Sequence, residues 1–258
     1  MSDFLRLSGL TLLLLAVLQA ATFLWSRRAG KYAVVDNVWG LGLGLVAVLG
    51  AVAGVGDLPR RLLLAVVLGA WGLRLTTHLL RRSSGAPEDP RYAAMSQGKS
   101  PLHMALRVFA LQGFLQWFIS LPVQVAASTG PVRGAAWALV VVGAALSLVG
   151  IAFESIGDRQ LTAFKADPAN KGRILDTGLW AWSRHPNYFG DACVWTGAWL
   201  VAAAVWPGVL TILSPLAMVY FLVVLSGGRL LEKHMEGRPG YAEYQARTSF
   251  FLPRPPKR

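Results

Sequence analysis

Charged residues are scarce in this sequence and cysteine is almost absent. Only 15% of the 258 residues are charged, whereas 54% are hydrophobic, and the mean hydropathy is +0.47. A soluble core of this size needs no such apolar content, so the composition excludes a soluble domain. Cys193 is the one cysteine and has no partner for an internal disulfide. The composition predicts an all-α integral membrane protein.

Familiar nucleotide and metal signatures are also missing. The sequence has no Gly-x-Gly-x-x-Gly after a strand, no Walker sequence and no paired Cys/His spacing. The net charge is +12, but the basic residues are dispersed among loops and form no DNA- or RNA-binding motif. We therefore expect no metal and no nucleic-acid partner. No obligate protein partner is evident, and membrane lipids are expected partners.

Seven apolar stretches have roughly the 20 residues with which a helix crosses a bilayer. They lie at about 4–25, 33–56, 60–80, 104–126, 134–156, 188–206 and 208–228. We expect them to form one membrane domain that includes the whole of residues 1–258.

Basic residues divide unevenly between the two ends of these spans. Arg74 lies within a span, and only Arg6, Arg60, Arg61 and Arg133 fall on one side. All the others follow spans one, three, five and seven, so the positive-inside rule places the N-terminus outside and the C-terminus in the cytoplasm. Topology explains most of the charge, and anionic lipids or an anionic cofactor are alternative causes.

Ionisable residues within the spans are few. Each one costs roughly 2.5–3.5 kcal/mol in the hydrocarbon on insertion scales, so Asp36, Arg74, Glu154 and Asp191 should face the bundle interior or an interface. Asp36 and Arg74 either neutralise each other structurally or take part in chemistry, and both interpretations stay open.

Amide side chains in the fourth span are a second polar feature. Gln112 and Gln116 lie one helical turn apart on one face, where they either bind helices together or contact a substrate. Asn37 and Trp39, next to Asp36, are candidates for lining a cavity.

Polar residues also gather where the sixth span begins, in Trp182–Asp191, directly before the apolar run Ala192–Trp206. A lipid-facing helix has no reason to begin in this way, so the stretch indicates a site at the membrane edge. The preceding cytosolic segment carries basic residues suited to phosphates, although a solvated juxtamembrane helix would carry them too. These residues are Lys165, Lys171, Arg173 and Arg184.

Several of these motifs together resemble one family. The motifs are Val35–Gly40, Leu73–Leu75, Pro87–Tyr92, Asp176–Trp180, Ser183–Asp191, Leu230–Lys233 and Arg238–Tyr244. Their order and spacing resemble the steroid 5-alpha-reductase superfamily, and more narrowly its bacterial branch. Relatives are seven-helix membrane enzymes that use NADPH to saturate a carbon–carbon double bond conjugated to a ketone. The resemblance implies a multi-pass protein of a bacterial inner membrane.

The resemblance implies a cofactor site formed by the cytosolic segments at about 154–191 and 229–247. Asn187 matches the asparagine that contacts the nicotinamide amide in the reductases, and Asp158 matches an aspartate of the cofactor-binding loop. The full implied set is Asp158, Lys165, Lys171, Arg173, Arg184, His185, Asn187, Tyr188, Asp191, Glu232 and Tyr244.

The resemblance also implies a substrate cavity between the first four helices. Asp36 aligns with the acidic member of a Gln-Glu pair in animal steroid reductases, and Arg74 aligns with a third-helix arginine, so both are implied catalytic residues. Val35 replaces the glutamine, and Trp71 stands where those enzymes have their proposed catalytic tyrosine. Asp36 would be the proton donor itself, if protonated, or would orient another donor. The implied substrate-binding residues are Asn37, Trp39, Trp71, Gln112 and Gln116.

We therefore expect an NADPH-dependent reductase of an apolar enone, such as a 3-oxo-Δ4 steroid, with the substrate entering from lipid. The alternative is an S-adenosylmethionine-dependent membrane methyltransferase of the isoprenylcysteine or phospholipid type. Those enzymes share an Arg-His-Pro-x-Tyr-x-Gly element, so residues 184–190 alone do not distinguish the two. A non-catalytic lipid-binding or scaffold protein is a third class.

Overall fold

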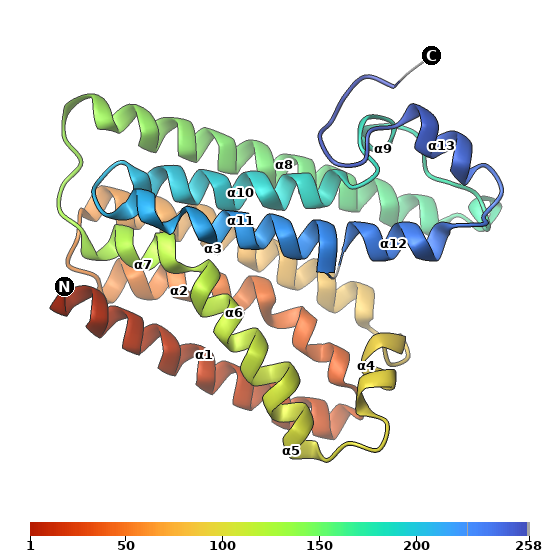
Figure 1. The fold of residues 1–258 in the computed structure, drawn as a ribbon, viewed down its shortest axis with the longest axis horizontal. Coiled ribbons are helices and arrows are strands. Elements are labelled where there is room, and N and C mark those ends of the chain that lie inside the picture. The colour runs from red at the N-terminus through yellow and green to blue at the C-terminus, as the bar shows by residue number, and fades with distance from the viewer. Residues whose placement is uncertain (226, 257–258) are drawn as a thin grey trace. The chain divides into compact units, whose positions relative to one another are not determined.

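The computed structural model describes residues 1–225 and 227–256, which are helical and contain no strand (Figure 1). The predicted all-α class is confirmed. Among the described residues, six helical segments are long and apolar enough to cross a membrane. They are Ser2–Ala29, Tyr32–Ala53, Leu58–Ser83, Pro101–Ile119, Gly134–Ala166 and Gly208–Met235. Ser226, within the last predicted span, and Lys257 and Arg258 lie outside the described residues.

The predicted sixth span is present as helix α10, Pro186–Ala203, but it is not among those six segments. Its first two turns carry Asn187 and Asp191, which lower its hydropathy. Most of its remaining residues are buried within the protein, as Val194 and Trp195 show. The coarser prediction of a multi-pass membrane protein is supported, whereas the count of seven and the orientation stay predictions.

The chain forms two compact units. Unit 1 comprises Met1–Val140 and Trp199–Ser214, and unit 2 comprises the described residues of Val141–Ala198 and Pro215–Arg258. All three boundaries, at 140/141, 198/199 and 214/215, fall inside helices, so no linker separates the units. The prediction of one membrane domain stays a prediction.

Unit 1 is built on α1 (Ser2–Ala29), α2 (Trp39–Ala53) and α3 (Leu58–Ser83). Helices α2 and α3 approach at Gly40 and Gly72, where a Cβ on Gly72 would lie only 2.2 Å from the Gly40 carbonyl oxygen. Small residues four positions apart permit this backbone contact between membrane helices. The close packing places the segment before α2, Tyr32–Val38, beside the end of α3.

The fourth predicted span, 104–126, is not one continuous α-helix. Its parts are α5 (Pro101–Met104), a π-helical turn (Ala105–Ala110), α6 (Leu111–Ile119) and α7 (Leu121–Ser128). The break falls at Ser120, because Pro122 has no amide with which to continue the helical ladder. Gln112 and Gln116 both belong to α6, as their spacing predicts.

The connection between α3 and α5 contains a short helix, α4 (Pro90–Ser96), which docks on the residues before α2. The Glu88 carboxylate accepts hydrogen bonds from the backbone amides of Tyr32 and Ala33, at 2.5 and 3.0 Å. The Lys31 ammonium donates to the Ala86 carbonyl. These contacts hold α4 at the end of unit 1 where the Tyr32–Val38 segment begins.

Unit 2 contains most of α8 (Trp137–Ala166) and α10. A Cβ on Gly150 would lie 2.4 Å from the Gly190 carbonyl oxygen, and the Ser147 hydroxyl donates to the Val194 carbonyl at 3.1 Å. Helix α8 continues ten residues beyond the predicted end of its span at 156, since no helix-breaking residue occurs before Pro168. The beginning of the predicted cytosolic segment is therefore helical.

The remaining elements of unit 2 are short. They are α9 (Leu179–Trp182), most of α11 (Leu213–Tyr220), a π-helical turn (Phe221–Leu225), α12 (Gly228–Met235) and α13 (Tyr241–Arg247). The chain after α13 binds back to the residues before α10. The Ser183 hydroxyl donates to the Phe251 carbonyl at 2.8 Å, and the Arg184 amide donates to the Ser249 carbonyl at 2.9 Å. The motif 183–191 is thereby fixed by the C-terminal segment.

Candidate functional site

Arg184 and Glu232 form the central contact of unit 2. The Arg184 guanidinium makes two parallel contacts with the carboxylate, Nε to Oε1 at 2.5 Å and Nη2 to Oε2 at 3.0 Å. Its third nitrogen donates to the carbonyls of Gln245 and Thr248. The two side chains are only 11% and 13% exposed. This bidentate pair is poorly exposed to solvent, and it holds α12 and the end of α13 against the residues that precede α10.

His185 lies between aromatic rings beside this pair. Its ring stacks on Tyr188 at a centroid distance of 5.5 Å and meets the edge of Phe250 at 5.1 Å. His185 Nε2 is 3.4 Å from Glu232 Oε1. Gly228 permits this arrangement, because a Cβ there would lie 3.2 Å from the imidazole.

Asn187 and Asp158 also lie together. Asn187 is in the first turn of α10, and its Nδ2 donates to Asp158 Oδ1 of α8 at 3.2 Å. The Asn187 Oδ1 accepts from the Tyr188 amide at 3.0 Å. Gly157 leaves room for the start of α10, because a Cβ there would lie 3.3 Å from the Cγ of Pro186. Two residues that the resemblance assigns to the cofactor are thus hydrogen-bonded to each other.

Three of the four predicted phosphate-binding cations are exposed, whereas the fourth, Arg184, is held by Glu232. Lys165 is in the last turn of α8, whereas Lys171 and Arg173 lie in the turn that follows it. Arg173 makes a long contact of 3.4 Å with the Asn170 amide oxygen. Exposed cations on one short segment retain the charge that a phosphate would pair with.

Tyr244 is almost completely buried and its hydroxyl donates to the Trp180 carbonyl at 2.6 Å. Burial raises the pKa of Tyr244. Burial also raises the pKa of Tyr241, with help from the nearby Glu232 carboxylate, to about 12. Both phenols therefore stay protonated at neutral pH. Asp191 is buried on α10.

A separate polar cluster lies in unit 1, centred on Asp36. The Tyr92 hydroxyl of α4 donates to Asp36 Oδ1 at 2.6 Å, and Arg91 Nη2 lies 3.4 Å from Oδ2. Asp36 thus forms an ion pair with Arg91, a partner that neither interpretation of Asp36 and Arg74 included. Asp36 is the fifth residue of its span and its side chain is 38% exposed, so it lies at the end of the span.

The hydrogen bonds of this cluster all run in one direction. Trp39 Nε1 donates to Gln112 Oε1 at 2.6 Å, and Gln112 Nε2 donates to the Tyr92 hydroxyl at 3.0 Å. Tyr92 in turn donates to Asp36. The chain of donors ends on the Asp36 carboxylate, which accepts from Tyr92 and faces Arg91.

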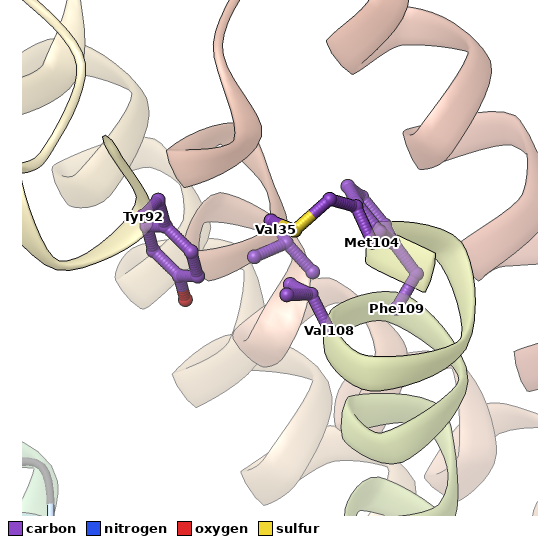
Figure 2. Packing of buried hydrophobic residues seen from close by; sticks show 5 residues of the cluster. All are labelled: Val35, Tyr92, Met104, Val108 and Phe109. Atoms are coloured by element: carbon purple, nitrogen blue, oxygen red, sulfur yellow. The ribbon is translucent and has the colours of Figure 1, made fainter. Parts of the chain in front are cut away.

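Tyr92 is the residue that the sequence analysis missed. It is buried among apolar side chains, and burial, followed by the Asp36 charge, raises its pKa. Figure 2 shows its ring beside Val35 and the side chains of Met104, Val108 and Phe109. The available signal was its position: it is the one tyrosine of the loop between the third and fourth spans.

The other predicted substrate residues are dispersed over unit 1. Gln116 donates to the carbonyls of Val38 and Trp39, both at 3.2 Å. Asn37 accepts from the Ser83 hydroxyl at 3.2 Å and so ties its segment to α3. Trp71 is completely buried on α3, and Arg74 is half-buried one turn later. Among the described residues no three His, Cys, Asp or Glu side chains are arranged to hold a metal ion.

Comparisons with known proteins support a family assignment and name no activity. A family model described as a protein of unknown function, DUF1295, matches residues 22–248. A protein of Schizosaccharomyces pombe, described as uncharacterized protein C594.04c, is 28% identical over 225 residues. That match covers 76% of this chain and 64% of the yeast protein. No solved structure matches this chain.

Proposed function

This chain belongs to the DUF1295 family, and we propose that it is an NADPH-dependent reductase that saturates the double bond of an apolar enone. The observation that carries the proposal is the hydrogen-bond chain from Gln112 through Tyr92 to Asp36. Reduction of an enone requires a donor to the carbonyl oxygen as negative charge develops there. A buried phenol kept protonated by its surroundings is such a donor.

The residues of unit 2 fit NADPH, the reduced form of nicotinamide adenine dinucleotide phosphate. Exposed Lys171 and Arg173 suit a dianionic phosphate, and the amide of Asn187 suits the carboxamide of nicotinamide. Asp158 orients that amide by accepting from its Nδ2. NADPH, when bound, supplies a hydride to the enone β carbon.

The residues of unit 1 would donate a hydrogen bond to the carbonyl oxygen of the substrate. The Tyr92 hydroxyl hydrogen is free to rotate, so the phenol can transfer its hydrogen bond from Asp36 to a carbonyl oxygen. Gln112 keeps a donor on the Tyr92 oxygen throughout and stabilises charge that develops on it. Arg91, 5.7 Å from the centre of the Tyr92 ring, offsets the Asp36 charge. Asp36 is then the residue that orients the donor.

Membership of the wider steroid 5-alpha-reductase superfamily, in its bacterial branch, is part of this proposal. So is a topology of seven crossings in a bacterial inner membrane, with α10 as the sixth crossing and the N-terminus outside. Cysteines placed at Lys99 and Gly130, two exposed positions, in a Cys193→Ser background test the topology. We expect an impermeant thiol reagent applied to intact cells to label position 130 and not position 99.

One observation favours the alternative, a membrane methyltransferase. The bidentate Arg184–Glu232 contact joins the Arg-His-Pro-x-Tyr-x-Gly element to a following acidic segment, and the methyltransferases share both features. Cofactor binding by the purified protein separates the two functions. We expect NADPH to bind, with its oxidation stimulated by apolar enones. Binding of S-adenosylmethionine without NADPH would establish the alternative, and binding of neither would favour a non-catalytic protein.

A further inference from the structure

A groove of about 400 Å³ lies on unit 1 between α1 and the segment Ala105–Phe114. Both of its walls belong to predicted membrane spans, and rim residues such as Leu12, Leu106 and Phe114 are exposed. The volume is within the range of small-molecule sites. Of the lining side chains, which all belong to the described residues, Gln19 alone is polar.

Small side chains on both walls leave the groove open. Ala16 and Ala20 on α1 face Ala110 and Gly113 on the opposite wall. At Gly113 a Cβ would lie 3.1 Å from the Cγ of Gln19, so glycine there leaves room for the stem of that glutamine. The groove is therefore bounded at this point by the Gln19 side chain.

The orientation of the Gln19 amide is fixed by its neighbour. Gln116 Nε2 donates to the carbonyls of Val38 and Trp39, so Gln116 must present its Oε1 to Gln19. Gln19 accordingly presents Nε2, which donates to that oxygen at 2.8 Å. The other end of the amide, Gln19 Oε1, is buried and accepts no hydrogen bond from the described residues. A buried amide oxygen normally has a donor.

We propose that this groove binds an apolar molecule that carries a hydroxyl group, and that the hydroxyl donates to Gln19 Oε1. A charged headgroup does not fit, because no ionisable side chain lines the groove to compensate for its lost solvation. A ketone, an ether or a plain hydrocarbon has no donor to offer. The binding requires no nicotinamide cofactor, so this inference goes beyond the proposed reductase activity.

The test uses the purified full-length protein in lipid nanodiscs, without NADPH. The probe is hexadecanol that carries a photoreactive diazirine on its chain, and the labelled peptides are identified by mass spectrometry. Unlabelled hexadecanol and its methyl ether, which has the same chain and no donor, compete for the site. We expect labelling of α1 and of residues 105–114, with the alcohol competing about fivefold or more better than the ether, the effect of one hydrogen bond.

Two variants separate the hydroxyl contact from the groove. In Gln19→Leu the alcohol and the ether should compete equally. Because this change also removes a partner of Gln116, Ala110→Trp provides a second variant that fills the groove and leaves the amide pair intact. Val66→Trp, at a lipid-exposed position on α3 outside the groove, is its matched control.

We expect Ala110→Trp to lose the labelling and Val66→Trp to keep it. Equal competition by the alcohol and the ether in the unsubstituted protein overturns the hydroxyl contact. Labelling that persists in Ala110→Trp overturns the site itself. Neither result bears on NADPH oxidation, so a failure of this inference is distinct from a failure of the proposed reductase function.

Discussion

Tyr92 donates a hydrogen bond to Asp36 across 2.6 Å and thereby joins helix α4 to the residues that begin the second span. The contact changes the role that the resemblance assigns to Asp36. Asp36 accepts from the phenol and faces Arg91, so in the proposed mechanism it orients the donor rather than donating itself. The group that retains a proton in this cluster is Tyr92. In the proposed mechanism, Tyr92 of α4 takes the place of the tyrosine that is missing at Trp71.

Tyr92→Phe tests this replacement. Phenylalanine keeps the ring that packs against Val35 and Met104 but removes the hydroxyl, so the protein should fold and bind NADPH as before. Turnover should fall roughly 10²- to 10⁴-fold, the contribution of a lost acid catalyst. The measurement is single-turnover NADPH oxidation with saturating enone.

Tyr32→Phe is the matched control. Tyr32 packs against the same cluster, and its hydroxyl makes only an exposed 3.3 Å contact with Arg27. We expect its turnover to stay within a factor of about two, since it loses no buried hydrogen bond. A near-normal rate in Tyr92→Phe would remove Tyr92 from the mechanism, whatever the control shows.

Asn187→Ala tests the nicotinamide contact. The variant loses the amide that Asp158 orients, and a polar contact whose partner is left unsatisfied is worth roughly 1–3 kcal/mol. We therefore expect NADPH affinity to fall about five- to a hundredfold while the protein stays folded in detergent. Equilibrium binding by calorimetry measures it. Unchanged affinity and turnover would falsify the assignment.

Charge reversal at Lys171 or Arg173 tests the preference for NADPH over NADH. Both cations are exposed in the turn after α8, where they can pair with the extra phosphate of NADPH. We expect Lys171→Glu and Arg173→Glu to weaken NADPH binding more than NADH binding. Lys233→Glu, an exposed lysine on α12, is the control and should affect both cofactors equally. If all three variants lost NADPH and NADH affinity equally, Lys171 and Arg173 would set the membrane topology and would not bind the extra phosphate.

The helices were largely predictable from the sequence because apolar runs of sufficient length have few alternatives in a bilayer. Even the two main differences have visible causes. Pro122 lies within the predicted fourth span, and nothing between 156 and Pro168 ends α8. Apolar residues suit contact with lipid and with protein alike, so the sequence of the α10 region did not show how much of that helix is buried against protein.

The pairings within the candidate site were not predictable from periodicity. Tyr92 and Asp36 are 56 residues apart, and their contact depends on how the connection between α3 and α5 docks. Glu88 fixes that docking by binding two backbone amides, a contact that leaves no period in the sequence. By contrast, Gln112 and Gln116 share a helix face, which helical spacing alone dictates.

Alkaline pH should destabilise unit 2 through Tyr241. The ordinary pKa of its phenol is 10.0, and burial together with Glu232 raises it to about 12. A raised pKa contributes stability that is fully present below pH 10 and is lost as the pH rises toward 12. Thermal unfolding across this range should show the loss, and Tyr241→Phe should reduce it. An identical alkaline profile in the variant would show that the pKa of this phenol does not differ between the folded and unfolded states.

The Arg184–Glu232 pair should behave as a buried pair, in contrast to the exposed pair of Arg247 with Asp176 in the same unit. Glu232→Gln leaves a poorly solvated guanidinium without its counter-charge, which should cost about 3 kcal/mol, whereas the double replacement Arg184→Met with Glu232→Leu should recover most of that loss. Asp176→Asn should cost no more than about 1 kcal/mol, because its pair is solvated. Denaturation in detergent measures all three variants. If Glu232→Gln proved as mild as Asp176→Asn while NADPH binding was lost, the carboxylate would be a cofactor ligand rather than the anchor of the C-terminal segment.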